Sequence, residues 1–327
     1  MNIVIANYGK VPVLKYGGTE RVLWYLGKEL AKMGHQVSFL MYEGSYCDFA
    51  KIIPFDRTRN INEQIPDDTD IVHLNFEPEH DIEKPYLVSI HGSRNDFKEF
   101  DLNTVFVSKN HAQRFGSTTY VYNGLDWDDY GKPDFNIKRE YFHFLGSAAW
   151  RAKNLKGAIK VVSLTPHEKL KVLGGYRLNF RMGFRLTLNP RISFEGMVGG
   201  AEKNRFLNGS KGLIFPVRLY EAFGLAMTES LYFGCPVFGT THGSLPEIVT
   251  KEYGYLSNNA VELSQAIMNV GQYDRKKCHE YAADNYNSKK MTQSYLQLYE
   301  RVLNGEKLNE VKPKLVEIKT EKFLAWS

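Results

Sequence analysis

The chain has 327 residues, 43% of them hydrophobic, and is therefore long enough to bury two separate cores. Its net charge of +5 is spread along the sequence without a block of Lys or Arg, so we expect no nucleic-acid partner. Cys47, Cys235 and Cys278 are too few and too widely separated for a disulfide framework or a metal motif, which favours a cytoplasmic location. We expect neither a signal peptide nor a membrane-spanning helix, while peripheral contact with the inner membrane face stays open.

Short apolar runs recur through the first part of the chain and predict a parallel sheet. Strands at residues 2–7 and 36–41 flank an amphipathic helix at 17–33, which makes a βαβ unit. Further strands are predicted at residues 70–75, 86–91, 104–108 and 120–123. The residues at the ends of these strands are polar, and we expect them to line one edge of the sheet, where ligands bind in open α/β folds: Asn7, Asn75, His91, Ser108 and Asn123.

A polar segment at residues 126–139, with Gly131 and Pro133, predicts a domain boundary. We therefore expect an amino-terminal domain at 1–139 and a second doubly wound α/β domain at 140–303. The second domain has a predicted helix at 155–163 and predicted strands at 141–145, 170–173, 192–194, 213–215 and 236–238. Residues 304–327 form a charged tail whose Trp326 we expect to pack back on the body.

The most informative stretch is Leu213–Cys235, which reads as a strand, a loop and a helix. Glu221 falls in the predicted loop, and Glu229 falls inside the helix that Gly224 introduces. Eight residues at helical rise span only about 12 Å, so the two carboxylates bracket something small. The first N–H groups of the helix attract an anion, and carboxylates accept hydrogen bonds from sugar hydroxyls. The pattern fits a nucleotide sugar, whereas an isolated Glu pair would equally be a solvated surface pair.

The same stretch carries a family resemblance. EAFGLAMTESLYFGCPV, followed by HGSLPEIV at 242–249, resembles the donor-site signature of the retaining GT-B glycosyltransferases of family 4 (glycosyl transferases group 1). The resemblance implies two Rossmann-like domains that face a cleft. It also implies that Glu229 binds the ribose, that Glu221 binds the donor sugar, and that the base lies near Met197. Backbone groups would hold the sugar and the diphosphate, at Phe223, Gly224 and Leu225.

The amino-terminal half carries two further parts of the resemblance. Tyr16-Gly17-Gly18-Thr19-Glu20-Arg21 resembles the glycine turn of the family, where an anion can approach the backbone. His91 stands where the family places a histidine near the donor sugar and the reaction centre. Without the resemblance, a glycine pair is more often a simple turn and a histidine at a strand end is commonly a satisfied polar residue. His73 is assigned to that structural class.

One position departs from the family pattern. Ser147 stands where the arginine after Gly146 is expected. By resemblance, Lys153 is the lysine that stabilises the departing diphosphate, and Arg151 is the candidate to replace the missing guanidinium. The structural alternative for both is a solvated basic loop.

Two charged patterns invite other interpretations. Arg177, Arg181 and Arg185 have a four-residue spacing, which on a helix would form a cationic stripe toward anionic lipid or a phosphorylated acceptor, or more simply a solvated face. Asp126-Trp127-Asp128 imitates a metal-binding DxD, but it follows Asn123-Gly124-Leu125 as the inter-domain element of the family does, so we expect no metal and no other cofactor.

The expected function is retaining, metal-independent transfer of a sugar from a UDP- or GDP-sugar to a glycan, lipid-linked or small-molecule acceptor. Surface-glycan or lipid-linked glycan synthesis is the expected context. The proposed catalytic residues are His91, Glu221 and Lys153. Two alternatives stay open: a non-catalytic nucleotide-sugar-binding subunit, which Ser147 favours, and a GT-B nucleotide-sugar epimerase that uses the same cleft without an acceptor.

Overall fold

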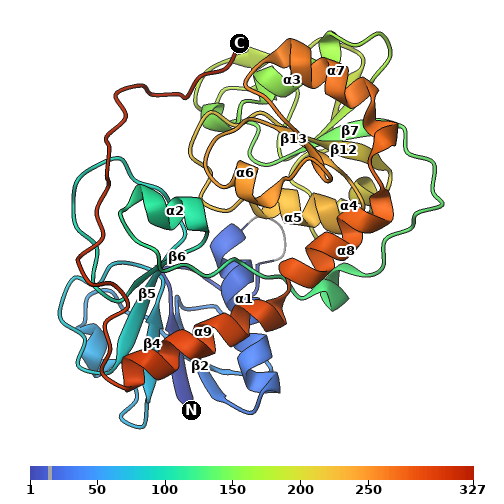
Figure 1. Ribbon diagram of the computed structural model, residues 1–327. Helices are drawn as coiled ribbons and strands as arrows, with labels where there is room; N and C mark the ends of the chain where they lie inside the picture. Colours follow the sequence, from blue (N-terminus) through green and yellow to red (C-terminus); the bar gives the residue numbers. More distant parts are fainter. Residues whose placement is uncertain (14–16) are drawn as a thin grey trace. The chain divides into compact units, whose positions relative to one another are not determined.

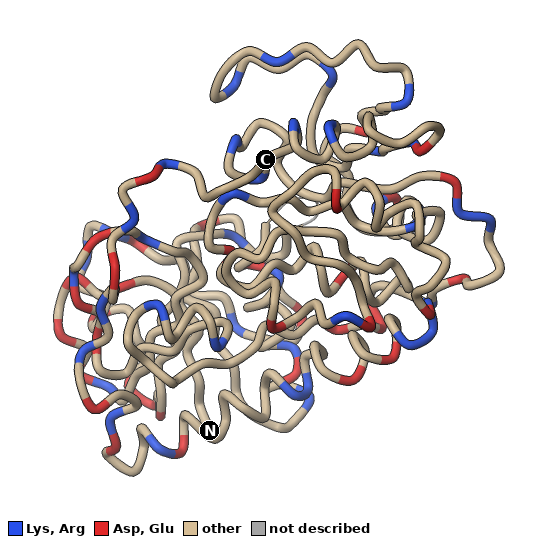
Figure 2. Tube along the Cα trace, turned by 45° about the horizontal axis from the view of Figure 1, so that its top comes forward, with Lys and Arg blue, Asp and Glu red and all other residues tan. Residues whose placement is uncertain are grey.

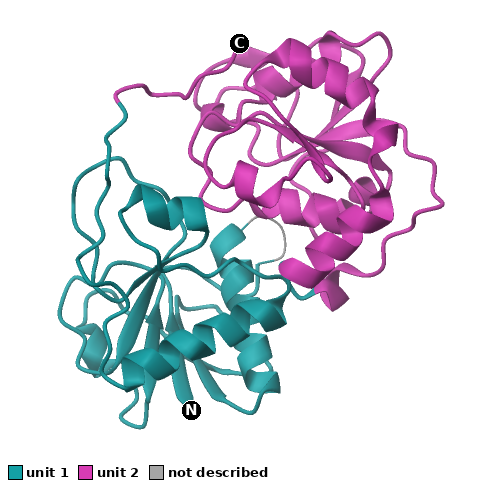
Figure 3. Ribbon diagram, viewed as in Figure 1, with its two compact units in different colours: residues 1–13, 17–126, 286–319 teal, residues 14–16, 127–285, 320–327 magenta. Residues whose placement is uncertain are grey.

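The computed structural model describes residues 1–13 and 17–327, and its described residues divide into two compact units (Figure 3). Unit 1 contains residues 1–13, 17–126 and 286–319, and unit 2 contains residues 127–285 and 320–327. The predicted ranges of 1–139 and 140–303 differ from this division at both ends. The change of unit falls at residue 127 instead of 140, and the last helix belongs to unit 1. None of the described helices is long and apolar enough to cross a bilayer.

Unit 1 is built on a parallel six-stranded sheet of order β3-β2-β1-β4-β5-β6 (Figure 1). The strands are β1 (Asn2–Ala6), β2 (Gln36–Met41), β3 (Lys51–Pro54), β4 (Ile71–Leu74), β5 (Tyr86–Ile90) and β6 (Thr104–Phe106). The helical segments are α1 (Gly18–Lys32), η1 (Ile61–Glu63), α2 (Lys109–Arg114) and α9 (Ser288–Leu303). The predicted strand at 120–123 is wrong, because this segment makes only an isolated bridge between Tyr120 and Phe106.

Helix α9 joins unit 1 through buried hydrogen bonds that its sequence position conceals. The Tyr299 hydroxyl lies 2.7 Å from His73 Nδ1, and the Tyr295 hydroxyl lies 3.0 Å from Ser89 Oγ. Ser89 Oγ also lies 2.8 Å from His73 Nε2, so both ring nitrogens of this fully buried histidine are satisfied. Burial lowers the pKa of His73 to about 3. The structural role assigned to His73 is confirmed.

Unit 2 repeats the architecture with a second parallel six-stranded sheet, of order β11-β8-β7-β12-β13-β14. The strands are β7 (Tyr141–Leu145), β8 (Leu170–Leu173), β11 (Ile192–Phe194), β12 (Ser210–Phe215), β13 (Val237–Gly239) and β14 (Gly254–Leu256). The helical segments are η2 (Trp127–Tyr130), η3 (Arg151–Lys153), α3 (Leu155–Ser163), α4 (Gly200–Asn208), α5 (Leu225–Tyr232), α6 (Leu245–Ile248), α7 (Ala260–Met268), η4 (Val270–Gln272) and α8 (Arg275–Asn285). In chain order both sheets follow the 3-2-1-4-5-6 arrangement of Rossmann domains, so the predicted α/β fold is confirmed.

A two-stranded antiparallel hairpin interrupts this pattern between β8 and β11. Its strands are β9 (Leu178–Asn179) and β10 (Arg185–Leu186). The helical stripe considered for Arg177, Arg181 and Arg185 is therefore wrong, since the chain here is extended or turning. In a strand, residues four apart share a face in any case, so the spacing could not distinguish the two structures.

The tail is divided between the units. Residues 304–319 belong to unit 1, where Leu315 is buried and the Phe100 N–H donates to the Pro313 carbonyl at 2.7 Å. Residues 320–327 belong to unit 2, where Trp326 packs against the hydrophobic core, as predicted. Lys and Arg are interspersed with Asp and Glu over much of the chain (Figure 2), but residues 169–194 contain no Asp or Glu.

Candidate nucleotide-sugar site

The predicted donor-site residues of unit 2 follow the carboxyl ends of adjacent strands. Lys153 follows β7, Met197 follows β11, and the loop of Glu221 follows β12, while β11, β8, β7 and β12 are consecutive neighbours in the sheet. Loops at this edge of a parallel sheet converge on the ligand site of doubly wound folds. The topology thus brings these segments to one edge of unit 2.

Helix α5 begins where the sequence predicted. Gly224 is its N-cap residue and has a left-handed backbone with φ 87°, which favours glycine. A Cβ atom there would lie 2.7 Å from Met227 Cε and 3.1 Å from Glu221 Cγ. Among the described residues no side chain caps the helix, so its first N–H groups and the positive end of its dipole are available to an anion.

Buried polar contacts hold α5 against the sheet. His143 on β7 lies 2.7 Å from Ser210 Oγ on β12 and 2.8 Å from Ser230 Oγ on α5. Arg139 Nη2 donates to the Phe233 carbonyl at 2.7 Å, which places a buried cation at the negative end of the helix. These bonds fix the position of the helix whose opposite end faces the proposed ligand.

Glu221 and Lys153 form a close ion pair. Lys153 Nζ lies 2.5 Å from Glu221 Oε2, and only about a tenth of each side chain is exposed, 11% for Lys153 and 12% for Glu221. The ammonium also lies 5.2 Å from the centroids of the Trp150 and Phe215 rings. The structure brings together these two predicted residues from distant parts of the chain.

The loop of Glu221 is braced by the next strand-end loop. The Ser244 N–H donates to the Glu221 carbonyl at 2.9 Å, and Ser244 Oγ donates to the Phe223 carbonyl at 2.8 Å. Gly243 has φ +66°, and a Cβ atom on it would lie 2.3 Å from Glu221 N and 2.4 Å from Glu221 O. Both residues belong to the HGSLPEIV motif, but the sequence did not reveal that their task is to hold Glu221.

Glu229 is almost fully buried, with 2% of its surface exposed, and two partners meet its Oε1 atom. The Tyr130 hydroxyl donates to it at 2.7 Å, and Lys203 Nζ forms a short hydrogen bond and ion pair with it. Neither partner was predicted. Lys203 lies on α4 and Tyr130 on η2, and no motif distinguishes them from ordinary helical residues.

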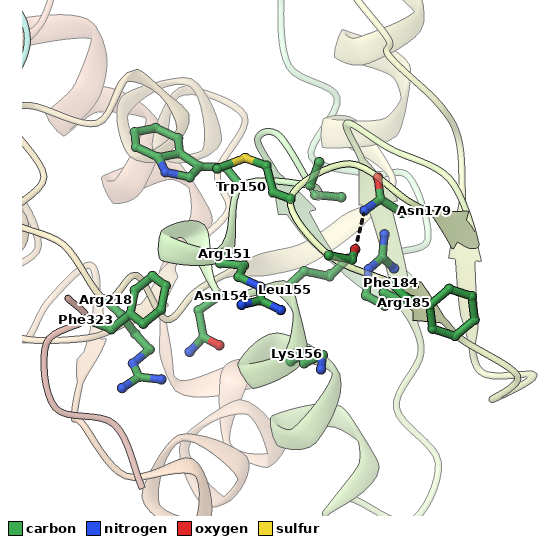
Figure 4. Close-up of a pocket in the computed structure, with 14 residues that line it drawn as sticks. Trp150, Arg151, Asn154, Leu155, Lys156, Asn179, Phe184, Arg185, Arg218 and Phe323 are labelled. Atoms are coloured by element: carbon green, nitrogen blue, oxygen red, sulfur yellow. Dashed lines mark hydrogen bonds between the residues drawn. The ribbon is translucent and has the colours of Figure 1, made fainter.

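Arg151 lies in a different direction from Lys153, although both belong to η3. A Cβ atom on Gly183 would lie 2.5 Å from Arg151 Nη2, so the guanidinium packs against the hairpin tip. It lines a cavity of about 210 Å³ together with Arg218 and Phe323 (Figure 4). Among the described residues, the ion-pair partner of Glu221 is Lys153 and not Arg151. The proposed replacement of the missing arginine by Arg151 stays a prediction.

The predicted site residues of unit 1 lie at the edge of its own sheet. His91 follows β5, and its Nε2 lies 3.0 Å from Asn75 Oδ1 at the end of the neighbouring β4. Burial lowers the pKa of His91 to about 4, which keeps the imidazole neutral at pH 7. Gly17 precedes α1 and Gly18 begins it. Tyr16, the first residue of the predicted turn, lies outside the described residues.

The first aspartate of the DxD-like segment, Asp126, forms ion pairs with helix α1. Asp126 lies 2.8 Å from Lys28 Nζ and 3.2 Å from Lys32 Nζ, both on α1. Within residues 1–13 and 17–327, no group of three His, Cys, Asp or Glu side chains is arranged to hold a metal ion. The ion pairs give Asp126 a role in attaching the inter-domain element to unit 1.

This combination of two Rossmann-like units is the GT-B glycosyltransferase fold. The chain superposes with a TM-score of 0.76 and 18% identity on AviGT4, a glycosyltransferase involved in avilamycin A biosynthesis, over 93% of this chain and 98% of that one. It superposes with a TM-score of 0.65 and 14% identity on Anabaena Alr3699/HepE in complex with UDP-glucose, over 93% of this chain and 100% of that one. At these identities the likeness establishes the fold.

The family-model match lies within unit 2. Residues 139–272 match the family model described as glycosyl transferases group 1. An uncharacterized 41.2 kDa protein in the cps region of Klebsiella pneumoniae is 27% identical over 123 residues, which make up 36% of this chain. The match spans about a third of that relative, 34% of its length. The family match contains the predicted donor-site residues from Lys153 to Glu229.

Proposed function

We propose that the protein transfers a sugar from a nucleoside diphosphate sugar to a hydroxyl acceptor. The observation that carries the proposal is the loop from Glu221 to Gly224, where a carboxylate paired with Lys153 stands beside an uncapped helix N-terminus. An uncapped N-terminus attracts a diphosphate, and a carboxylate accepts bonds from sugar hydroxyls. The UDP-glucose complex of Alr3699/HepE supports a nucleotide-sugar donor for this fold.

The residues would share the work as follows. Glu221 accepts hydrogen bonds from the donor sugar, Glu229 accepts them from the ribose, and the backbone of Phe223, Gly224 and Leu225 receives the sugar and diphosphate. Lys153 offsets the charge that develops on the departing diphosphate. The base lies near Met197.

Groups of unit 1 would complete the reaction in this proposal. The neutral imidazole of His91 exchanges a hydrogen bond with a sugar hydroxyl, and the Gly17-Gly18 turn admits a phosphate close to the backbone. The anomeric configuration is retained by front-face displacement, in which the leaving phosphate takes the acceptor proton. No metal takes part. The acceptor is a glycan, a lipid-linked sugar or a small molecule, and the location is cytoplasmic.

The test is a panel of UDP- and GDP-sugars incubated with the protein and acceptor extracts. Release of the nucleoside diphosphate that depends on both donor and acceptor is expected, and proton NMR of the product should show the donor's anomeric configuration. A product of inverted configuration would refute front-face displacement. Loss of activity with a chelator, reversed by Mn²⁺, would refute the metal-free mechanism.

Ser147 favours one second candidate, a non-catalytic nucleotide-sugar-binding subunit. The family arginine is absent there, and Arg151 packs against Gly183. A subunit of this kind would bind a nucleotide sugar in calorimetry but release no diphosphate with any acceptor. Release by the wild-type protein, lost in Lys153→Met, would exclude it.

A further inference from the structure

The hairpin of unit 2 has its apolar side turned to solvent. Leu178 pairs with Leu186 in the antiparallel register, and Asn179 pairs with Arg185. Side chains alternate between the two faces of a strand, so one face carries every large apolar residue of the hairpin arms. This set, named the hairpin face, consists of Tyr176, Leu178, Phe180, Phe184, Leu186 and Leu188, which are each 48–76% exposed.

The polar face of the hairpin points into the protein. Arg177 donates to the Thr187 carbonyl at 2.7 Å and to the Ile192 carbonyl at 2.8 Å. Arg185 is buried and donates to the Tyr176 carbonyl at 3.0 Å. A two-stranded ribbon at a solvent-exposed protein surface normally has the opposite arrangement, with its apolar side inward. The orientation of this ribbon is fixed by buried Arg185 and by the backbone hydrogen bonds of Arg177, so the hairpin face cannot turn inward without breaking these bonds.

The tip of the hairpin is also apolar and is held in a defined turn. Asn179 Nδ2 donates to the Arg181 carbonyl at 2.6 Å and to the Gly183 carbonyl at 3.3 Å, the latter bond being dashed in Figure 4. The rings of Phe180 and Phe184 lie with their centroids 5.8 Å apart. Met182 at the turn is 60% exposed. The tip thus presents an aromatic pair and a methionine together.

Exposed cations lie beside the tip of this apolar surface. Residues 169–194 contain no Asp or Glu. Of their Lys and Arg residues, Arg177 and Arg185 bond to backbone carbonyls on the other face, and Arg181 stands at the tip. Beside the tip, the cavity of Figure 4 adds Arg151 and Lys156. Arg181, Arg151 and Lys156 are exposed, and none of them forms an ion pair with a described residue. An apolar tip among cations complements a layer that is apolar inside and anionic at its surface.

We propose that the hairpin face of unit 2 docks onto an anionic lipid bilayer. Phe180, Met182 and Phe184 would enter the boundary between headgroups and acyl chains, and Arg181 would meet lipid phosphates. A second copy of the chain suits the surface less well, because two facing tips would bring Arg181 and its equivalent together without a carboxylate from residues 169–194. The docking requires no catalytic step and stands independently of the proposed transferase activity.

The test is flotation of the full-length protein with two kinds of vesicle, one of phosphatidylcholine alone and one containing about 30% phosphatidylglycerol. We expect binding to the anionic vesicles that weakens with salt. Phe180→Ser with Phe184→Ser should lower binding at least about tenfold, because two aromatic side chains lose their apolar contact. Arg181→Glu should lower it as well. The control for the double-serine variant is Tyr46→Ser with Phe97→Ser, which removes two aromatic side chains that are exposed elsewhere. The control for Arg181→Glu is Lys132→Glu. Both controls should bind the vesicles as the wild type does.

Three results would overturn the proposal. The wild-type protein could fail to float with the anionic vesicles. The double-serine variant could bind them as well as the wild type does. Light scattering could show a wild-type dimer that the double-serine variant loses, which would assign the hairpin face to a second copy. Affinity for nucleotide sugars in solution should be equal in the wild type and the double-serine variant, so failure of docking and failure of the proposed function are separable.

Discussion

Replacement of Gly243 by Ala tests whether the loop after β13 positions Glu221. Gly243 has φ +66°, and the added Cβ would lie 2.3 Å from Glu221 N and 2.4 Å from Glu221 O, whereas ordinary van der Waals contact begins at 3.4 Å. Both contacts are with backbone atoms, which cannot rotate away as a side chain can. The Glu221 backbone must therefore move by about 1 Å to restore contact distance.

Two effects of this substitution can be separated. A left-handed backbone at Ala costs about 1–2 kcal/mol of stability wherever it occurs. Displacement of a substrate-positioning group by about 1 Å lowers turnover by about 100-fold. Gly34→Ala is the matched control, because Gly34 has φ +88° but nothing lies within 4 Å of an added Cβ. The control should lose only the stability that the left-handed backbone costs, about 1–2 kcal/mol, and keep its activity.

The assay combines denaturant unfolding with donor turnover. We expect both variants to be destabilised and only Gly243→Ala to lose about 100-fold in kcat/KM for the donor. If Gly243→Ala and Gly34→Ala turn over the donor equally well, the brace between Gly243 and Glu221 does not matter for function and the reasoning is refuted.

Three further predictions concern ionisable side chains. Lys153→Met should lower kcat about 100-fold or more, because the leaving group loses its stabilisation. Lys156 is an exposed neighbour, and Lys156→Met should leave kcat unchanged. Equal kinetics of the two variants would contradict the role of Lys153. Glu229→Ala should cost about 3–5 kcal/mol of stability, because it removes the carboxylate that forms an ion pair with the buried Lys203 ammonium. The double variant Lys203→Met with Glu229→Gln should unfold at a higher denaturant concentration than Glu229→Ala does, and the reverse order would show that the pair is not buried as described. Burial lowers the pKa of His143 from 6.5 to about 3. Above pH 6.5 the histidine is therefore neutral in the folded and the unfolded state and adds no pH dependence to the stability. Below pH 6.5 the unfolded state binds the proton first, so stability falls by about 1.4 kcal/mol per pH unit. His143→Gln should flatten that slope between pH 6 and 4 in denaturant titrations, and an unchanged slope would show that His143 is not buried in neutral form.

The parts of the fold that the sequence predicted share a physical cause. Strands such as Tyr141–Leu145 and helices such as Leu155–Ser163 are local, periodic and apolar, so their bounds could be read directly. The strand–loop–helix from β12 to α5 was predicted for the same reason, with Gly224 at its N-cap. Local patterns therefore located the candidate site.

The features that escaped prediction depend on partners far away in the chain. The ion pair of Lys203 with Glu229 joins two helices, and nothing in the sequence indicates that these two residues pair. The placement of α9 with unit 1 depends on Tyr295 and Tyr299 meeting Ser89 and His73. The hairpin was missed because residues four apart share a face in a strand, so the spacing of the arginines did not distinguish a strand from the expected helix. In each case tertiary contacts decide between structures that the local pattern allows equally.

The most direct test of the donor site is calorimetric binding of a nucleoside diphosphate and of its sugar derivative to the wild type, Glu221→Gln and Glu229→Gln. If Glu229 holds the ribose, Glu229→Gln should weaken both ligands alike, by about tenfold, because both contain the ribose. If Glu221 holds the sugar, Glu221→Gln should weaken the nucleotide sugar by a similar factor and leave the diphosphate unchanged. Unchanged affinities in both variants, or equal losses for both ligands in Glu221→Gln, would contradict the assignment of the two carboxylates.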